Sequence, residues 1–166
     1  MSDHNNMKDQ IPKEIASISA KLKKAGFEAY LVGGCTRDLL IGRKPKDWDF
    51  ASNATPDQIV SVFGSEKTFY ENDFGTVTVK NPTSPEGDTG PRGASEDESL
   101  RNVEITPYRK EGKYTDKRRP DNVTWAKTLR EDLERRDFTI NSIAYDVDKD
   151  EIIDPFNGQK DRKSVV

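Results

Sequence analysis

Residues 31–50, LVGGCTRDLLIGRKPKDWDF, constrain the fold of this chain more than any other stretch. An apolar run leads into a glycine pair, a short apolar segment follows, and a further run carries two aspartates separated by one tryptophan. This order predicts a strand, a glycine turn, a short helix and a second strand. Successive side chains of a strand point to opposite faces, so Asp47 and Asp49 are expected to share one face, opposite Trp48.

Apolar spacing and turn residues predict the other elements of secondary structure. Residues 125–146 are predicted to be helical, with a break near Asp137. Strands interleaved with helices indicate an α/β (α+β) fold built on a mixed sheet with flanking helices. Helices are expected at residues 12–25, 35–42 and 56–63, and strands at residues 27–32, 47–51, 67–70, 75–80, 102–108 and 151–154.

Composition limits the size of the fold. The chain has 166 residues, of which 32% are hydrophobic and 34% charged. These values suit one domain with a modest core and much solvated or partner-facing surface. Because the net charge is −3, there is no overall attraction to nucleic acid, and an RNA partner would require a local basic patch.

Cysteine and histidine are too scarce for several common kinds of site. Cys35 is the single cysteine and His4 the single histidine, which excludes an internal disulfide and a Cys/His zinc cluster and argues against a histidine-dependent mechanism. No stretch approaches the roughly 18 apolar residues of a membrane span. The polar N-terminus also lacks the pattern of a signal peptide. A cytoplasmic protein in a reducing setting, without a membrane partner, is therefore expected.

The paired aspartates are candidate metal ligands. Two adjacent carboxylates repel each other and one tends to hold a proton, whereas a divalent cation such as Mg²⁺ removes the conflict and prefers oxygen ligands. In NVEITPYR, Glu104 alternates with apolar neighbours, so it joins Asp47 and Asp49 if its strand runs beside theirs. A solvated polar strand face or an ordinary amphipathic strand would show the same residues, and both alternatives stay open.

The glycine pair is a candidate phosphate site. Gly33 and Gly34 lie between a predicted strand and a predicted helix, where backbone N–H groups can approach an anion. Arg37, on the first turn of that helix, could support the same phosphates. The alternative is a plain glycine turn followed by a surface arginine. The spacing matches neither a P-loop nor a GxGxxG fingerprint.

Two later segments have opposite charge. Residues 82–99 are rich in Pro, Gly, Ser and acidic residues, which is typical of a mobile excursion. Residues 109–122 form a basic loop that begins with Arg109 and contains the consecutive residues Lys117, Arg118 and Arg119. Such a run is suited to RNA phosphates, although a solvated surface would have the same composition.

The residues quoted so far resemble a known family. LVGGCTRDLLIGRKPKDWDFASNATP is similar to the first motif of the class II tRNA nucleotidyltransferases and bacterial poly(A) polymerases, in the polymerase β-like nucleotidyltransferase superfamily. The resemblance implies a catalytic head with a mixed, mostly antiparallel sheet flanked by helices. In that motif a glycine pair and an arginine face the triphosphate and two acids bind Mg²⁺. Those roles fall on Gly33, Gly34, Arg37, Asp47 and Asp49.

Two further stretches extend the resemblance. ERRDFTINSIAYD is similar to the family's second motif, whose RRD portion contacts the nucleotide near its ribose, and this implies binding roles for Arg136, Asp137 and Asn141. A surface ion pair before a capped helix is the alternative interpretation of RRD. FGTVTV and VEITPYRKEGKYTDKRRPDNVTW resemble the CCA-adding branch, in which the loop that corresponds to residues 109–122 helps the switch from C to A addition.

The resemblance runs from about residue 12 to the end of the chain. It implies a flexible N-terminus at residues 1–11, a catalytic head at 12–150 with an acidic insertion at about 82–99, and an exit toward a neck domain at 151–166. The family selects its base on a neck helix with an EDxxR stretch and grips tRNA with body and tail domains. The chain ends before these parts, so an excised head is expected in preference to a minimal stand-alone enzyme.

The expected function is Mg²⁺-dependent addition of C and A from CTP and ATP to the tRNA 3′ end, with release of pyrophosphate. Asp47, Asp49 and Glu104 would place the metal, and Arg37 and Arg136 would balance the triphosphate charge. Two alternatives are a poly(A) or A-only adding enzyme and a non-catalytic nucleotide- or RNA-binding fragment. The identity of the incorporated nucleotide distinguishes the first alternative from CCA addition. Salt-dependent RNA binding without product would favour the second alternative.

Overall fold

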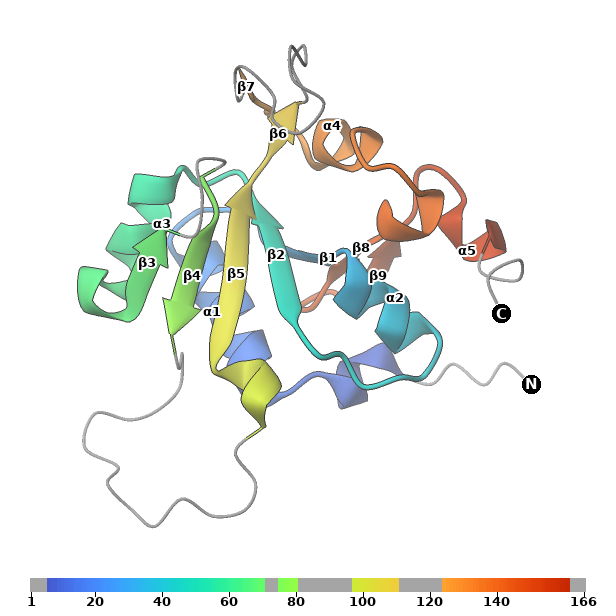
Figure 1. Cartoon of the computed structure of the whole chain (residues 1–166), viewed down its shortest axis with the longest axis horizontal. Coiled ribbons are helices and arrows are strands. Elements are labelled where there is room, and N and C mark those ends of the chain that lie inside the picture. Colours follow the sequence, from blue (N-terminus) through green and yellow to red (C-terminus); the bar gives the residue numbers. More distant parts are fainter. Residues whose placement is uncertain (1–5, 71–74, 81–96, 111–123, 162–166) are drawn as a thin grey trace.

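A seven-stranded sheet forms the centre of the computed structural model, which describes residues 6–70, 75–80, 97–110 and 124–161 (Figure 1). The strand order is β3-β4-β5-β2-β1-β8-β9. Strands β2 and β5 pair in parallel, and the other neighbours in this sheet pair antiparallel, which confirms the predicted mixed, mostly antiparallel sheet. The strands are β1 (Tyr30–Val32), β2 (Trp48–Ser52), β3 (Thr68–Tyr70), β4 (Val77–Lys80), β5 (Asn102–Pro107), β8 (Ala144–Asp146) and β9 (Glu151–Ile153).

Helices and one small second sheet surround the central sheet. Strands β6 (Arg109–Lys110) and β7 (Thr124–Trp125) pair antiparallel beyond the end of β5 (Figure 1). Among the described residues, no helix is both long enough and apolar enough to cross a lipid bilayer. The helices are α1 (Lys13–Lys24), α2 (Gly34–Leu40), α3 (Pro56–Phe63), α4 (Leu129–Glu134) and α5 (Gly158–Asp161), and the 3-10 turns are η1 (Met7–Gln10), η2 (Ser65–Lys67), η3 (Glu98–Leu100) and η4 (Thr139–Asn141).

The main core lies between one face of the sheet and helices α1 and α3. Helix α1 buries a face at helical spacing, with Ile15, Ile18 and Leu22 fully buried. Trp48 and Phe50 of β2 pack into the same core, as their alternation with the aspartates predicts. The turn η1 also contributes to this core through Met7, so part of the N-terminal segment 1–11, which was expected to be flexible, packs against the sheet.

The opposite face of the sheet is only partly covered. Ala51, which follows Phe50 in β2, belongs to a second and smaller apolar cluster with Val32, Tyr108, Ala126, Leu133 and Ala144. Side chains on this face that are not covered by the cluster remain open to solvent or to a ligand. Asp49 alternates with Phe50 in the same way, so the predicted site lies on this second face.

One predicted element is wrong. Residues 125–146 were expected to form a broken helix, but they form α4 and η4 and then strand β8 between β1 and β9. All three residues of β8 are buried. A short apolar run such as INSIAYDV does not reveal by periodicity whether it is a buried helix or an interior strand, and pairing with distant strands decides. The acidic insertion falls outside the described residues, apart from its end at residues 97–99.

Candidate functional site

An open, mainly polar pocket lies on the second face of the sheet. Its volume is about 240 Å³. Strands β1, β2, β5 and β6, the residue before β4, the turn after β1 and the segment after α4 supply its walls, so residues far apart in the sequence converge there. The lining residues are Val32, Gly33, Asp49, Phe50, Thr76, Glu104, Thr106, Arg109, Arg135 and Arg136.

Asp49 and Glu104 form the acidic floor of this pocket. They are direct partners in the parallel register of β2 and β5, as expected for a strand that runs beside the aspartates. Burial raises the pKa of Asp49 to about 7, and a hydrogen bond with Glu104 and the charge of that carboxyl act in the same direction. Arg136 opposes the shift. The Asp49 carboxyl therefore tends to hold a proton, which is the behaviour predicted for one of two paired acids without a cation.

Asp47 has a different position from the one predicted. It lies in a bend just before β2, not within the strand, and its side chain is exposed. Asp47 is close enough for its charge to raise the pKa of Asp49, but it does not line the pocket. Within the described part of the chain, no group of three or more His, Cys, Asp or Glu side chains has an arrangement that could hold a metal. Asp49 and Glu104 thus meet directly, and Asp47 lies beside them.

The glycine turn approaches these acids closely. Gly33 has a φ of 74°, which favours glycine. A Cβ built there would lie 3.8 Å from Arg136 Nη1 and 4.0 Å from Asp49 Oδ2, so the backbone of the turn faces both side chains. Arg37 does not line the pocket. Its Nε and Nη2 atoms each lie 3.4 Å from Asp38 Oδ1, and its side chain is 42% exposed.

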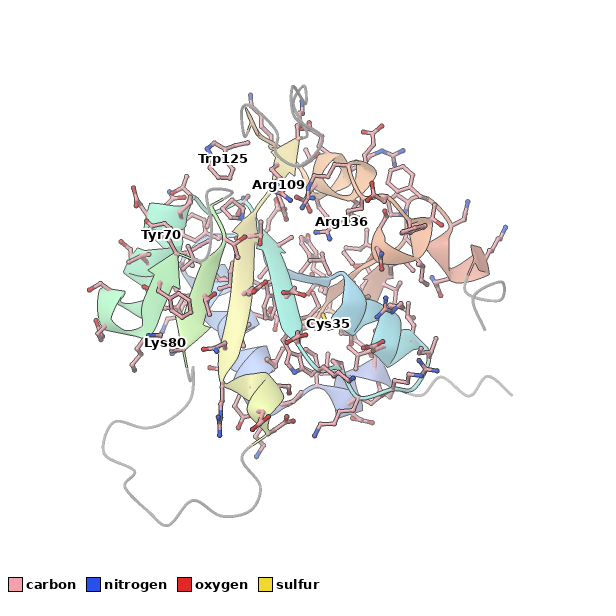
Figure 2. All side chains as sticks on the ribbon, in the orientation of Figure 1. Cys35, Tyr70, Lys80, Arg109, Trp125 and Arg136 are labelled. Atoms are coloured by element: carbon pink, nitrogen blue, oxygen red, sulfur yellow. The ribbon has the colours of Figure 1, made fainter. Side chains whose placement is uncertain are left out.

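Three arginines form the basic wall of the pocket, namely Arg109, Arg135 and Arg136. Figure 2 shows Arg109 and Arg136 on the same side of the molecule, between β5 and α4. Side chains of Arg135 and Arg136 are only 11% and 17% exposed. Arg135 was not among the predicted site residues. Its position next to Arg136, three residues after Asp132 on a helix, is the sequence signal that could have identified it.

Two threonines add hydroxyl groups beside the acids, and they too were missed. Thr76 Oγ1 and Thr106 Oγ1 lie 3.1 Å apart and are hydrogen-bonded. Thr106 shares a face of β5 with Glu104, and this alternation in NVEITP is a signal that the sequence contains. The pocket therefore offers hydroxyl, carboxyl and guanidinium groups within one small volume.

The remaining predicted residues divide into three groups. Asp137 is exposed and does not line the pocket. Asn141 lies on η4, where its buried Oδ1 has no hydrogen-bond partner among the described residues. Lys117, Arg118 and Arg119 lie outside the described residues, so their predicted role in a basic loop is not assessed by the geometry.

The chain is similar to a known protein family over most of its length. The family profile described as "Poly A polymerase head domain" matches residues 29–166, a range that includes all residues of the pocket. The CCA-adding enzyme of Lactococcus lactis subsp. lactis (strain IL1403) is 43% identical over 162 residues, which are 93% of this chain and 36% of that relative. The CCA-adding enzyme of Geobacillus kaustophilus (strain HTA426) is 42% identical over 149 residues, which are 89% of this chain and 32% of that relative. The chain thus spans about a third of the length of these curated relatives.

Solved structures give the same picture. The Bacillus stearothermophilus CCA-adding enzyme in complex with CTP is similar with a TM-score of 0.68 and 32% identity, over 92% of this chain and 32% of that one. A tRNA nucleotidyltransferase complexed with a primer tRNA and an incoming ATP analog is similar with a TM-score of 0.59 and 27% identity, over 88% of this chain and 36% of that one. In both cases the similarity covers about a third of the longer protein.

Proposed function

We propose, from the premise that this chain belongs to the poly A polymerase head domain family, that it is the catalytic head of a tRNA nucleotidyltransferase that adds C and A to the tRNA 3′ end. The observation that carries the proposal is the pairing of Asp49 and Glu104 in a pocket walled by arginines. Similarity to CCA-adding enzymes, one of them with bound CTP, supports this branch over poly(A) or A-only addition.

In the proposed reaction the 3′-hydroxyl oxygen of the RNA attacks the α-phosphorus of CTP or ATP. A P–O bond forms to the RNA, the bond to the β-phosphate oxygen breaks, the hydroxyl proton is released and pyrophosphate leaves. The triphosphate carries several negative charges, and the side chains of Arg109, Arg135 and Arg136 face the pocket in which it would bind. Fixed positive groups there balance charge on the nucleotide and on the leaving pyrophosphate.

Nucleotidyltransferases of this family generally use divalent metal ions. The carboxyl groups of Asp49 and Glu104, with Asp47 beside them, are the oxygen donors that Mg²⁺ prefers. The raised pKa of Asp49 fits such a site, because a cation can take the place of the proton on this carboxyl. When bound, the ion supplies charge neutralisation and activation of the attacking hydroxyl. We assign Mg²⁺ to the carboxylates of Asp47 and Asp49, since this ion is commonly held by two carboxylates together with water and substrate phosphates, and Glu104 would lie beside it as the third acid.

Other residues take roles around the nucleotide in this proposal. Backbone N–H groups of Gly33 and Gly34 contact phosphate oxygens, and Arg37 supports the same charge from the surface of α2. Asp137 and Asn141 act near the ribose. The partners are CTP, ATP and a tRNA 3′ end, and the reducing cytoplasm is the compartment that suits the chain.

The test is Mg²⁺-dependent incorporation of labelled CTP and ATP, each alone and together, on tRNA that lacks its CCA end. We expect the wild-type chain to incorporate label from both CTP and ATP, and Asp49→Ala and Asp47→Ala to abolish product while the circular dichroism spectrum stays unchanged. Asp148→Asn, a change in an exposed carboxylate away from the pocket, is the matched control and should leave incorporation intact.

Each result has a definite meaning. Incorporation of A alone would replace the proposal with A-only or poly(A) addition. Full activity in Asp49→Ala would remove the acidic pair from catalysis. Nucleotide binding without product would identify a head domain that requires other parts for turnover, and salt-dependent RNA binding without nucleotide binding would favour a non-catalytic RNA-binding module.

A further inference from the structure

Asp132, on helix α4, is a fully buried carboxylate that contacts the basic wall of the pocket at three points. Its Oδ1 accepts hydrogen bonds from the backbone N of Arg109 at 3.1 Å and from Arg135 Nε at 3.2 Å. Its Oδ2 accepts a hydrogen bond from Arg136 Nη2 at 3.1 Å. All three arginines line the pocket, but Asp132 does not. One side chain outside the pocket therefore accepts hydrogen bonds from all three of its basic residues.

Local sequence explains the arrangement. Thr128 caps α4 by accepting a hydrogen bond from the backbone N of Glu131, and Asp132 then lies in the first turn. Arg135 and Arg136 follow at spacings of three and four residues, the spacings at which side chains on a helix meet. The contact to Arg109 joins α4 to β6, a segment far away in the sequence.

The Arg136 guanidinium lies between the Asp132 carboxylate and the glycine turn beside Asp49. One nitrogen, Nη2, is bonded to Asp132, while the other, Nη1, faces the turn at Gly33 and the neighbouring Asp49. Its Nε is buried and has no hydrogen-bond partner among the described residues. Without Asp132, rotation about the side-chain bonds would be free to carry Nη1 away from the turn, because among the residues that the structure describes Asp132 is the hydrogen-bond partner that orients this guanidinium.

Burial of Asp132 makes its pairing with the arginines necessary. The side chain of Asp132 is 1% exposed, and a charge in such a place is stable only when it is paired and hydrogen-bonded. Burial lowers the pKa of Arg135, and the charge and hydrogen bond of Asp132 oppose that change. The carboxylate thus maintains a dense group of positive charges that would otherwise repel one another.

We propose that Asp132 is a positioning residue for nucleotide binding, which sets the Arg136 guanidinium opposite Gly33 and Asp49 and attaches Arg109 to the same wall. The inference rests on the proposed function in one respect, that the ligand of the pocket is a nucleoside triphosphate. Asp132 itself does not touch the nucleotide. It acts by reducing the freedom of groups that do, so that less conformational entropy is lost on binding.

The purely structural alternative is that Asp132 stabilises the fold and nothing more. The chain offers a matched control for this alternative in Asp146, a buried carboxylate on β8 that also accepts three hydrogen bonds, from Lys23 Nζ and from the backbone N of Asp148 and Lys149. Asp146 does not line the pocket. Asp146→Asn should cost stability without changing the orientation of any pocket arginine.

The experiment is calorimetric titration of CTP with Mg²⁺ into wild-type chain, Asp132→Asn and Asp146→Asn, with the melting temperature of each measured in parallel. We expect affinity to fall about tenfold or more in Asp132→Asn, since one charge-assisted contact corresponds to about that factor, and to stay within about twofold of wild type in Asp146→Asn. Equal affinities for wild type and Asp132→Asn would overturn the inference while leaving the proposed function intact. Failure of the wild type to bind CTP, and to bind ATP titrated in the same way, would refute the proposed function and the inference with it.

A second comparison applies if Asp132→Asn does not fold. The double variant Asp132→Asn with Arg135→Gln removes one buried charge of each sign, and Arg135→Gln alone is its reference. The inference predicts weaker CTP binding by the double variant than by Arg135→Gln, because Arg136 has lost its buried partner. Equal binding by these two variants would overturn it.

Discussion

At the scale of single residues, the chemistry of Asp49 depends on what lies beside it. The β2–β5 register places this carboxyl against Glu104, and burial with that neighbour raises its pKa to about 7. An isolated carboxyl of the same type would be ionised throughout the neutral range. The pair is therefore costly in the free protein, and a cation or a proton is required to relieve it.

A pH dependence of stability follows from this shift. The folded state binds the Asp49 proton more tightly than the unfolded state, so the free energy of unfolding falls as pH rises from about 4 to 7 and the loss persists above pH 7. Asp49→Asn removes this loss. Relative to wild type in the absence of divalent cations, we expect the variant to gain roughly 2–4 kcal/mol between pH 4 and pH 8, at about 1.4 kcal/mol for each unit of pKa. Urea unfolding of both proteins at pH 4 and pH 8 measures this gain. A difference in the free energy of unfolding between variant and wild type that is the same at both pH values would contradict the raised pKa of Asp49.

Gly75 is a second residue at which the surrounding side chains leave no room for a Cβ atom. It has a φ of 80°, and a Cβ there would lie 3.2 Å from Pro56 Cγ and would collide with the ring of Trp125. Gly26 has a φ of 93° and open space around it, so it is a matched control for backbone strain alone. Trp125 is 45% exposed and lies near Arg109 (Figure 2), its partner in the register of β6 and β7.

We expect Gly26→Ala to lower the free energy of unfolding by about 1 kcal/mol through strain, and Gly75→Ala to lower it by at least about 2 kcal/mol because the clash adds to the strain. Urea unfolding followed by tryptophan fluorescence compares the two. Trp125→Ala in the Gly75→Ala background should recover part of the loss. Similar losses for the two glycine variants would show that Trp125 does not pack on Gly75 in solution.

At the scale of elements, helix α3 begins with a complete capping box. Thr55 Oγ1 accepts a hydrogen bond from the backbone N of Gln58, and the Gln58 side chain accepts one from the backbone N of Thr55. Pro56 occupies the first helical position, where its missing N–H costs nothing. These features explain why the start of α3 was predicted correctly from the sequence.

The helix cap should affect the stability of the fold without affecting nucleotide incorporation at the pocket. Thr55→Ala removes an acceptor for a helix N–H group and should lower the free energy of unfolding by about 1 kcal/mol. Thr55→Ser keeps a hydroxyl acceptor and should retain most of the stabilisation that the cap supplies. Because α3 does not line the pocket, nucleotide incorporation measured well below the melting temperature should be unchanged in both variants. A loss of incorporation in Thr55→Ala at full folding would show that α3 influences the pocket.

At the scale of the whole molecule, the second face of the sheet is left open where the pocket lies. The main core covers one face, while the second cluster is small and leaves the arginine wall and the acids exposed to the pocket. A ligand that binds the folded state alone stabilises it in proportion to RT ln(1 + [L]/Kd). Metal and nucleotide together should therefore stabilise the chain more than either alone.

Thermal unfolding with and without Mg²⁺ and CTP tests this expectation. At a ligand concentration of about 100 times Kd we expect a gain of about 2.7 kcal/mol, which chelation of the metal should largely abolish and which Asp49→Ala should lack. Asp148→Asn is again the control with an unchanged response. A stabilisation by CTP that chelation does not reduce would contradict a metal held by the acidic pair.

The local features of this protein follow from its amino-acid sequence. The burial of Trp48 and Phe50 opposite Asp49, the apolar face of α1 and the cap of α3 follow from spacing along the chain, since side-chain direction and capping depend on near neighbours. Which distant segments meet is visible only in the folded chain, and the folded chain accounts for four features of the site and the sheet. It paired Glu104 with Asp49, brought Arg135 into the pocket behind which Asp132 lies, left Asp47 outside it, and turned residues 144–146 into an interior strand. These outcomes depend on strand pairing and helix docking across the sheet, and spacing within one segment carries no information about its partners.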